Sequence, residues 1–181
     1  MTPMFGRRRR DAAEPATAPA TGPLPMPPTR ERLAAHLRSQ AYSFGTDADG
    51  DLAARWDGNP FWLMLLGDRE EVLQVRGRWA SAVPLTSRTT ALHLVNDWNR
   101  DRYWPKAYVR EEQGALSLYG ECSTDLESGV TDGQLGELVE QALETTLSLF
   151  AVAEASLGPV AIRPERPEPQ AGPPASEQPE D

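Results

Sequence analysis

The residues of this sequence with the clearest capacity for chemistry are cationic side chains in the middle of the chain. Arg76, Arg78 and Lys106 could form a small positive spot, and guanidinium and ammonium groups bind carboxylates through charge-assisted hydrogen bonds. Such a spot would suit an acidic peptide or a small anion. The chain that carries it is acidic, with 27 Asp and Glu residues against 18 Lys and Arg and a formal net charge of −9.

Five tryptophans are spread through the same part of the sequence, several of them next to arginines. Trp and Arg dominate the energetic centres of protein interfaces, because they offer a large rigid surface and a fork of hydrogen-bond donors. The alternative is that the tryptophans fill a core between sheet and helices. We expect about three of them in the core and one or two on a functional surface. They are Trp56, Trp62, Trp79, Trp98 and Trp104.

A cluster of amides surrounds Trp98, in the run Asn-Asp-Trp-Asn-Arg. Asn99 can bond to backbone groups and help to end a helix, and this structural role is favoured because side chains that fix chain reversals are common. The alternative is a groove at a helix-to-strand junction, lined by Trp98, Asn99 and residues 105–106. The candidate partner- or ligand-binding residues are therefore Arg76, Arg78, Trp79, Trp98, Asn99, Trp104 and Lys106.

Asp47, Asp49 and Asp51 alternate along the chain in the manner of a calcium-binding loop. Such a loop would need glycine at its sixth position, where Leu52 stands, and glutamate at its twelfth, where Gly58 stands. The turn propensity of aspartate explains the same residues without a metal. The sequence therefore predicts a hairpin turn here and no metal site.

The remaining nucleophilic and ligating residues are scattered. His36 and His93 lie on predicted helices, and neither has a partner at metal-ligand spacing. Cys122 shares strand parity with Leu116 and Leu118, which points it toward the core, where a thiol behaves as a small inert hydrophobe. No phosphate-cradling, dinucleotide-binding, nucleophile-elbow or zinc-protease motif occurs. We expect a protein that is not an enzyme, with no catalytic residues and no cofactor.

Proline marks where a folded domain can lie. Of the 17 prolines, only Pro60, Pro84 and Pro105 stand in the central part of the sequence. Segments rich in Pro, Ala and Glu cannot bury enough apolar surface to offset the entropy lost on ordering them. We therefore expect one domain at residues 29–157, a disordered tail at 1–28 that includes four arginines at 7–10, and a disordered acidic tail at 158–181.

Charge and hydropathy exclude several kinds of partner. Most of the net charge belongs to the predicted domain, and an acidic surface repels phosphate backbones, so we expect no nucleic-acid partner. No apolar run approaches the roughly 20 residues of a membrane helix, and no apolar stretch follows the four arginines as a signal sequence requires. Cys122 is the single cysteine, which rules out an internal disulfide framework. We expect a cytoplasmic protein that does not bind membranes.

The elements that would position these residues follow the order α-β-β-β-α-β-β-α. Thr29 is a good cap for a first helix, and turn pairs at 49–50 and 57–58 separate three strands. A second helix runs to about Arg100, and a tight turn at 113–114 joins two further strands. The predicted fold class is α+β, with an antiparallel sheet of about five strands packed against helices.

A final amphipathic helix is the clearest element of the sequence. Thr131 and Gln134 fit a capping box at its start. We expect Leu147 to face the core, so that Leu147→Asp would prevent folding by burying an unpaired charge. The predicted apolar stripe comprises Leu135, Leu138, Val139, Ala142, Leu147, Phe150 and Ala151.

Four stretches of the sequence carry a family resemblance. They are DADGDLAARWDGNPFWLMLLG, LQVRGRW, NDWNRDRYWPKAYVREE and GVTDGQL, and together they resemble the actinobacterial branch of the YbjN domain family, labelled sensory transduction regulators. The resemblance covers about residues 29–157. It implies an αβββαββα fold similar to that of type III secretion chaperones, which are small acidic cytosolic proteins that often dimerise.

Two functions fit these observations. The first is a non-enzymatic protein-binding module, chaperone-like or a signalling regulator, that binds an unidentified protein on its sheet face or edge. The alternative is a sensor domain that binds a small anionic metabolite or peptide through Arg76, Arg78 and Lys106. A weak homodimer is also expected, because a sheet has two edges that need pairing or protection. Salt should favour that dimer by screening the negative charge of the domain.

Overall fold

The computed structural model describes residues 22–158 of the 181-residue chain. The predicted disordered tails fall mainly on residues 1–21 and 159–181, which lie outside the described residues.

One antiparallel sheet of six strands forms the centre of the domain. The predicted α+β class is confirmed, with six strands in place of about five because a short first strand pairs with the second. That first strand has only three residues, too few to show an alternating pattern. Across the sheet the order is β1-β2-β3-β4-β6-β5. The strands are β1 (Phe44–Thr46), β2 (Leu52–Trp56), β3 (Asn59–Leu66), β4 (Val72–Arg78), β5 (Lys106–Glu112) and β6 (Ala115–Asp125).

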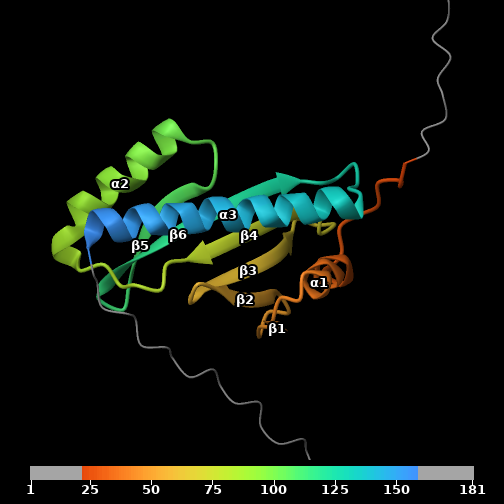
Figure 1. Ribbon diagram of the computed structural model, residues 1–181, viewed down its shortest axis with the longest axis horizontal. Helices are drawn as coiled ribbons and strands as arrows, with labels where there is room; N and C mark the ends of the chain where they lie inside the picture. The colour runs from red at the N-terminus through yellow and green to blue at the C-terminus, as the bar shows by residue number, and fades with distance from the viewer. Residues whose placement is uncertain (1–21, 159–181) are drawn as a thin grey trace, which may run out of the picture.

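Three helices lie together on one face of this sheet (Figure 1). They are α1 (Arg30–Ser39), α2 (Arg88–Asp101), which follows a short 3-10 turn at Leu85–Ser87, and α3 (Asp132–Leu157). The long helix α3 crosses the sheet, with α1 beside its N-terminal half and α2 beside its C-terminal half (Figure 1). One sheet face is therefore packed in the core, and the other points away from all three helices.

The hairpin turns form where the sequence predicts them. Asp57 and Gly58 both have positive φ, at 50° and 76°, and so do Gln113 and Gly114, at 53° and 76°. Two consecutive left-handed residues give a turn whose twist matches that of the flanking strands. These turns set the register of β2 with β3 and of β5 with β6.

The aspartate run also forms a turn, as predicted, between β1 and β2. The Asp47 carboxylate accepts hydrogen bonds from the backbone N–H groups of Asp49 at 3.0 Å and of Asp51 at 2.9 Å. These bonds close the loop from within, which gives Asp47 a structural role in the turn.

Both predicted helix caps are present. The hydroxyl of Thr29 accepts a hydrogen bond from the backbone N–H of Arg32 at the start of α1, at 3.2 Å. At the start of α3, the Thr131 hydroxyl accepts from the Gln134 N–H at 3.2 Å, and the Gln134 side chain accepts from the Thr131 N–H at 3.1 Å. This reciprocal pair is the capping box that the sequence predicts.

The buried stripe of α3 differs from the predicted one. Leu149 is fully buried, whereas Leu147 is only half-buried and Ala151 is exposed. With 3.6 residues per turn, positions 147 and 151 are rotated by about 100° or more from the centre of the stripe. The predicted stripe was therefore right at Leu135, Val139, Ala142 and Phe150, whereas Leu147 packs only against the edge of the core and Ala151 lies outside it. The buried residues of α3 are Leu135, Gly136, Val139, Ala142, Leu143, Thr146, Leu149, Phe150 and Ala153.

A pair of glycines allows α3 to lie close to the sheet. Gly77 of β4 and Gly120 of β6 are cross-strand partners beneath Thr146. A Cβ atom on Gly77 would lie 2.6 Å from the Phe61 ring and 2.7 Å from the Thr146 methyl group, and one on Gly120 would lie 2.8 Å from that methyl group. Residues without a side chain are thus required where the helix crosses these two strands.

The segment that precedes α1 is tied to the domain by Arg32. Its guanidinium donates to the carbonyl oxygens of Met26 at 2.8 Å, Pro27 at 2.7 Å and Val130 at 2.7 Å, and to the Asp132 carboxylate at 2.7 Å. Met26 and Val130 also form an isolated antiparallel bridge. Residues just before the predicted domain start at position 29 therefore contact the domain.

Two truncations should separate these contacts from the residues before them. Removal of residues 1–28 should lower the free energy of unfolding by about 2 kcal/mol, because the mostly buried Arg32 guanidinium loses two carbonyl acceptors. Removal of residues 1–21 should leave it unchanged. Chemical denaturation of both proteins measures the difference, and identical midpoints would show that the Arg32 contacts contribute no stability.

Candidate functional site

The sheet face that points away from the helices carries an unusual mixture of aromatic and charged residues. Cross-strand pairing places Trp62, Arg76, Glu121 and Lys106 in one row across β3, β4, β6 and β5. We call this surface the open sheet face. It comprises Trp62, Met64, Gln74, Arg76, Arg78, Lys106, Tyr108, Arg110, Glu112, Ser117, Tyr119 and Glu121.

Glu121 is the first centre of charge on the open sheet face. Its carboxylate accepts from Arg76 Nε at 3.1 Å and from the Tyr108 hydroxyl at 3.0 Å, and Lys106 Nζ lies 3.5 Å from its other oxygen. The Glu121 side chain is only 11% exposed. The structure thus brings together two of the predicted cations, Arg76 and Lys106, around one carboxylate, which balances only one of their two positive charges.

Glu112 is the second centre of charge. Its carboxylate accepts from the Ser117 hydroxyl at 2.8 Å and from the Tyr119 hydroxyl at 3.0 Å, and Arg110 Nε lies 3.7 Å from it. The rings of Tyr119 and Tyr108 stack with their centres 5.3 Å apart, which joins the two centres. The open sheet face is therefore a connected polar and aromatic network.

The tyrosines of this network remain protonated at neutral pH. Burial raises the pKa of Tyr108 to about 12; Arg76 opposes this rise and Glu121 adds to it. Burial also raises the pKa of Tyr119, and the hydrogen bond from its hydroxyl to Glu112 raises this pKa further. Both phenols therefore donate hydrogen bonds to carboxylates, and neither can act as a base near neutral pH.

Arg78 differs from the other cations of the open sheet face. Among the described residues no carboxylate forms an ion pair with it, and its Nε is buried without a hydrogen-bond acceptor. Its guanidinium carbon lies 5.9 Å from the centre of the Trp62 ring. The guanidinium also forms a hydrogen bond with the Tyr119 hydroxyl, and this bond and the charge of Arg78 oppose the rise in the pKa of Tyr119. Arg78 is a half-buried cation without a counter-charge in the described part of the chain.

The other predicted site residues lie elsewhere. Trp79 and Trp98 are buried in the core, at 6% and 4% exposure. Asn99 donates to the Ala107 carbonyl and accepts from the Ala107 N–H, both at 2.9 Å, so it joins α2 to β5 as the structural interpretation expects. Trp104 is half-exposed in the loop before β5. The seven candidates therefore do not form one site.

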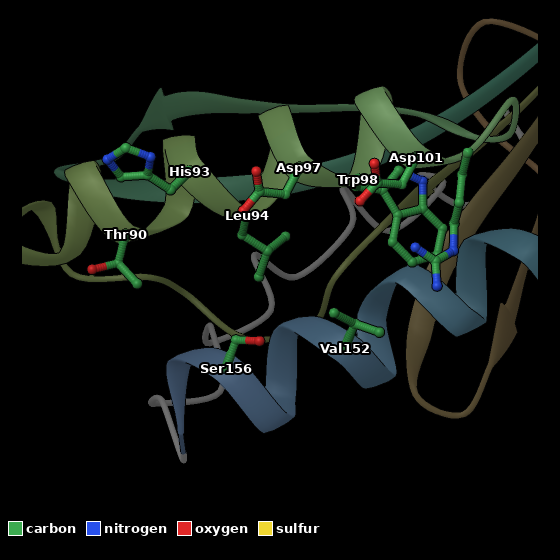
Figure 2. Close-up of a pocket in the computed structure, with 9 residues that line it drawn as sticks. Thr90, His93, Leu94, Asp97, Trp98, Asp101, Val152 and Ser156 are labelled. Atoms are coloured by element: carbon green, nitrogen blue, oxygen red, sulfur yellow. The ribbon is translucent and has the colours of Figure 1, made fainter.

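A groove of about 310 Å³ lies between α2 and the C-terminal half of α3 (Figure 2). Leu94 and Val152 face each other across it, and Arg102 covers the Trp98 ring at 4.4 Å. Trp98 is the one predicted site residue that lines this groove. Its indole N–H donates a hydrogen bond to the carbonyl oxygen of Pro105, just before β5, at 3.1 Å.

The metal-ligating and nucleophilic side chains of the described residues are scattered. Within 22–158, no group of three or more His, Cys, Asp or Glu side chains is placed to hold a metal ion. Cys122 is half-buried with the Thr145 hydroxyl at 4.0 Å, and burial raises the pKa of its thiol, so the thiolate is disfavoured. His36 Nε2 lies 2.9 Å from the Glu140 carboxylate, a contact that joins α1 to α3.

Sequence reasoning missed several residues of the open sheet face, including Trp62, Tyr108, Tyr119 and Glu121. A partial signal was present, since Tyr119 and Glu121 have opposite parity to the core-facing Leu118 on the same strand. Parity alone does not tell which strands are neighbours. The network became visible only with the pairing of β4 with β6 and of β6 with β5.

Comparison with known families finds one matching family over most of the described chain. The YbjN family, described as "Putative bacterial sensory transduction regulator", matches residues 29–155. No curated protein matches the sequence. Within 22–158, no helix combines the length and apolar character needed to cross a bilayer.

Solved structures share the fold at low sequence identity. "Crystal structure of YbjN, a putative transcription regulator from E. coli" superimposes with a TM-score of 0.62 and 19% identity, covering 73% of this chain and 95% of that one. An uncharacterized protein from Methanothermobacter thermautotrophicus gives 0.51 and 10%, covering 71% and 98%. The HopA1-SchA chaperone-effector complex gives 0.45 and 17%, covering 67% and 91%, a likeness too slight to support an inference.

Proposed function

This chain belongs to the YbjN family, and from that premise we propose that its domain is a non-enzymatic protein-binding module, either chaperone-like or regulatory. The family is described by regulation and not by a reaction. The observation that supports the proposal most directly is the open sheet face. A six-stranded sheet with all its helices on one side leaves a broad second face for a partner.

The composition of that face is what favours binding. An antiparallel sheet often has one solvated face, so an uncovered face by itself indicates nothing. Solvated faces are usually rich in small polar and charged residues, however, whereas this one carries the partly exposed rings of Trp62 and Tyr108 beside several arginines, with Met64 and Tyr119 buried among them. Aromatic residues, Met and Arg are the types enriched at protein interfaces.

Photo-crosslinking in cells of the native host tests this proposal. A photoreactive amino acid in place of Lys106, whose side chain is 69% exposed on the open sheet face, should give a discrete adduct with a second protein. The same amino acid in place of Glu144, exposed on the outer side of α3, is the matched control and should give none. Adducts from position 144 alone, or from neither position, would contradict a partner site on the sheet.

A sensor of small anions is the second candidate function, and the observation that favours it is the position of Arg78 without a carboxylate among the described residues. A thermal shift with citrate or glutamate distinguishes the two candidates. A true ligand at 100 times its dissociation constant adds about 2.7 kcal/mol of stability. The first proposal also includes a weak homodimer that pairs through an edge of the sheet. It places the protein in the cytoplasm.

A further inference from the structure

The starting point is the distribution of counter-charges on the open sheet face. Arg76 and Lys106 share Glu121, and Arg110 lies beside Glu112. Arg78 is the cation of this face for which the described residues supply no carboxylate. On a chain with net charge −9, a cation without an ion-pair partner among the described residues, beside three cations that contact carboxylates, is a specific feature.

The surroundings of Arg78 increase its attraction for an anion. A guanidinium has five N–H donors in a rigid fork and stays charged in proteins, and here the Nε donor is buried without an acceptor. Partial removal from water strengthens a charge–charge interaction, because the local dielectric falls. The Trp62 ring supports the guanidinium from one side, which restricts its orientation before any ligand arrives.

A carboxylate is the group that this arrangement fits. Its two oxygens accept two parallel N–H bonds from a guanidinium, and this pairing is among the strongest charge-assisted hydrogen bonds in proteins. The buried Nε has no neighbour among the described residues that could supply such oxygens. The terminal nitrogens of this half-buried guanidinium would therefore receive the carboxylate, beside the Trp62 ring and the Tyr119 hydroxyl to which Arg78 is already hydrogen-bonded.

The shape and charge of the face indicate an extended peptide as the carrier of that carboxylate. Arg76 and Arg78 are two residues apart on β4, which places them about 7 Å apart on one face, the same spacing as alternate side chains of an extended chain. The four cations Arg76, Arg78, Lys106 and Arg110 outnumber the two carboxylates Glu112 and Glu121 there. The partly exposed rings of Trp62 and Tyr108 offer contact area for neighbouring apolar residues.

We propose that Arg78 is the recognition site for an Asp or Glu carboxylate in an acidic, extended segment of the partner protein, bound across the open sheet face beside Trp62. This proposal rests on the proposed protein-binding function and identifies the chemistry of its partner. Specificity comes from the fork of Arg78, and affinity comes from that ion pair together with the aromatic surface around it.

The experiment begins with a displayed library of random peptides selected on the whole chain. The selected peptides should be rich in Asp and Glu and should bind when made synthetically, as measured by calorimetry. Versions with Gln and Asn in place of Glu and Asp should lose at least tenfold in affinity. Enrichment of peptides without acidic residues would overturn the Arg78 proposal while leaving protein binding intact; no enrichment at all would overturn both.

Variants of the chain then locate the site. Arg78→Gln should weaken the acidic peptide by about tenfold to a hundredfold, since hydrogen bonds to charged groups are worth that much. Arg78→Lys should recover only part of the loss, because an ammonium lacks the fork. Arg100→Gln, which removes the same charge from the exposed surface of α2, is the control and should bind as the parent does. Equal affinity of the parent and Arg78→Gln would overturn the proposal.

A last arm separates a peptide from a free anion. Citrate and free glutamate, at concentrations that match the carboxylates of the peptide, should displace the peptide only weakly, because they lack contacts with Trp62 and the tyrosines. Displacement by citrate at the concentration at which the peptide itself competes would assign Arg78 to a small-anion sensor and overturn the peptide proposal. Circular dichroism melting of Arg78→Gln verifies that the variant is folded.

Discussion

Replacement of Leu149 by aspartate should prevent the domain from folding. Leu149 is fully buried on α3, where the helix packs against the sheet near Gly120. The substitution removes about 2–5 kcal/mol of apolar packing and adds the cost of a buried, unpaired carboxylate, several kcal/mol more. A domain of this size has about 5–15 kcal/mol in total, so little or no folded protein should remain. Circular dichroism and soluble yield measure the outcome.

The matched control for this prediction is Leu147→Asp. Leu147 is half-buried at the edge of the α3 stripe, so its carboxylate can reach water and the cost should be about 1–2 kcal/mol. That variant should fold and melt at a lower temperature. The reverse result, an unfolded Leu147 variant and a stable Leu149 variant, would mean that Leu147 and not Leu149 lies at the centre of the buried stripe of α3.

Gly77→Val should destabilise the domain strongly, even though valine is among the best strand-forming residues. Strand propensity spans only about 1 kcal/mol. The new Cβ would lie 2.6 Å from the Phe61 ring and 2.7 Å from the Thr146 methyl group, and both of these side chains are fully buried and cannot move into solvent. We expect a loss of about 3 kcal/mol, at the upper end of overpacking costs, measured by urea denaturation.

Gly45→Val on β1 provides the control for Gly77. Gly45 is exposed, its added Cβ would meet no atom within 4 Å, and its strand is an edge of the sheet. This substitution should be neutral or stabilise the protein by up to about 1 kcal/mol through strand propensity. If both valine variants have the same stability, the close approach of α3 to the sheet at Gly77 is not a constraint on the fold.

The structure also explains why conspicuous sequence motifs do not mark a site. The Trp98 indole donates to the Pro105 carbonyl and Asn99 pairs with both backbone groups of Ala107, so this motif fastens α2 to β5. The side chain of the buried Asn59 accepts from the Ala80 N–H and donates to the carbonyls of the turn before it. Both sets of side chains fasten chain reversals, and the partner site that we propose lies on less conspicuous residues of the open sheet face.

Features that depend on neighbouring residues could be predicted from the sequence by itself. The cap at Thr29, the capping box of Thr131 with Gln134 and the turn pair at 57–58 all form as predicted, because each is closed by hydrogen bonds or backbone conformations within four residues. The fold class followed from the same local signals, since their order left few ways to arrange one sheet and its helices.

Features that depend on distant residues were decided only by the tertiary structure. Parity along β4 already placed Arg76 and Arg78 on one face, but Lys106 joined them through the pairing of β4 with β6 and of β6 with β5. The sequence pattern of each strand is satisfied by any neighbour of suitable polarity, so it does not specify which strands pair or in what register. Which cations share Glu121, and which one lacks a carboxylate, is therefore a property of the assembled sheet.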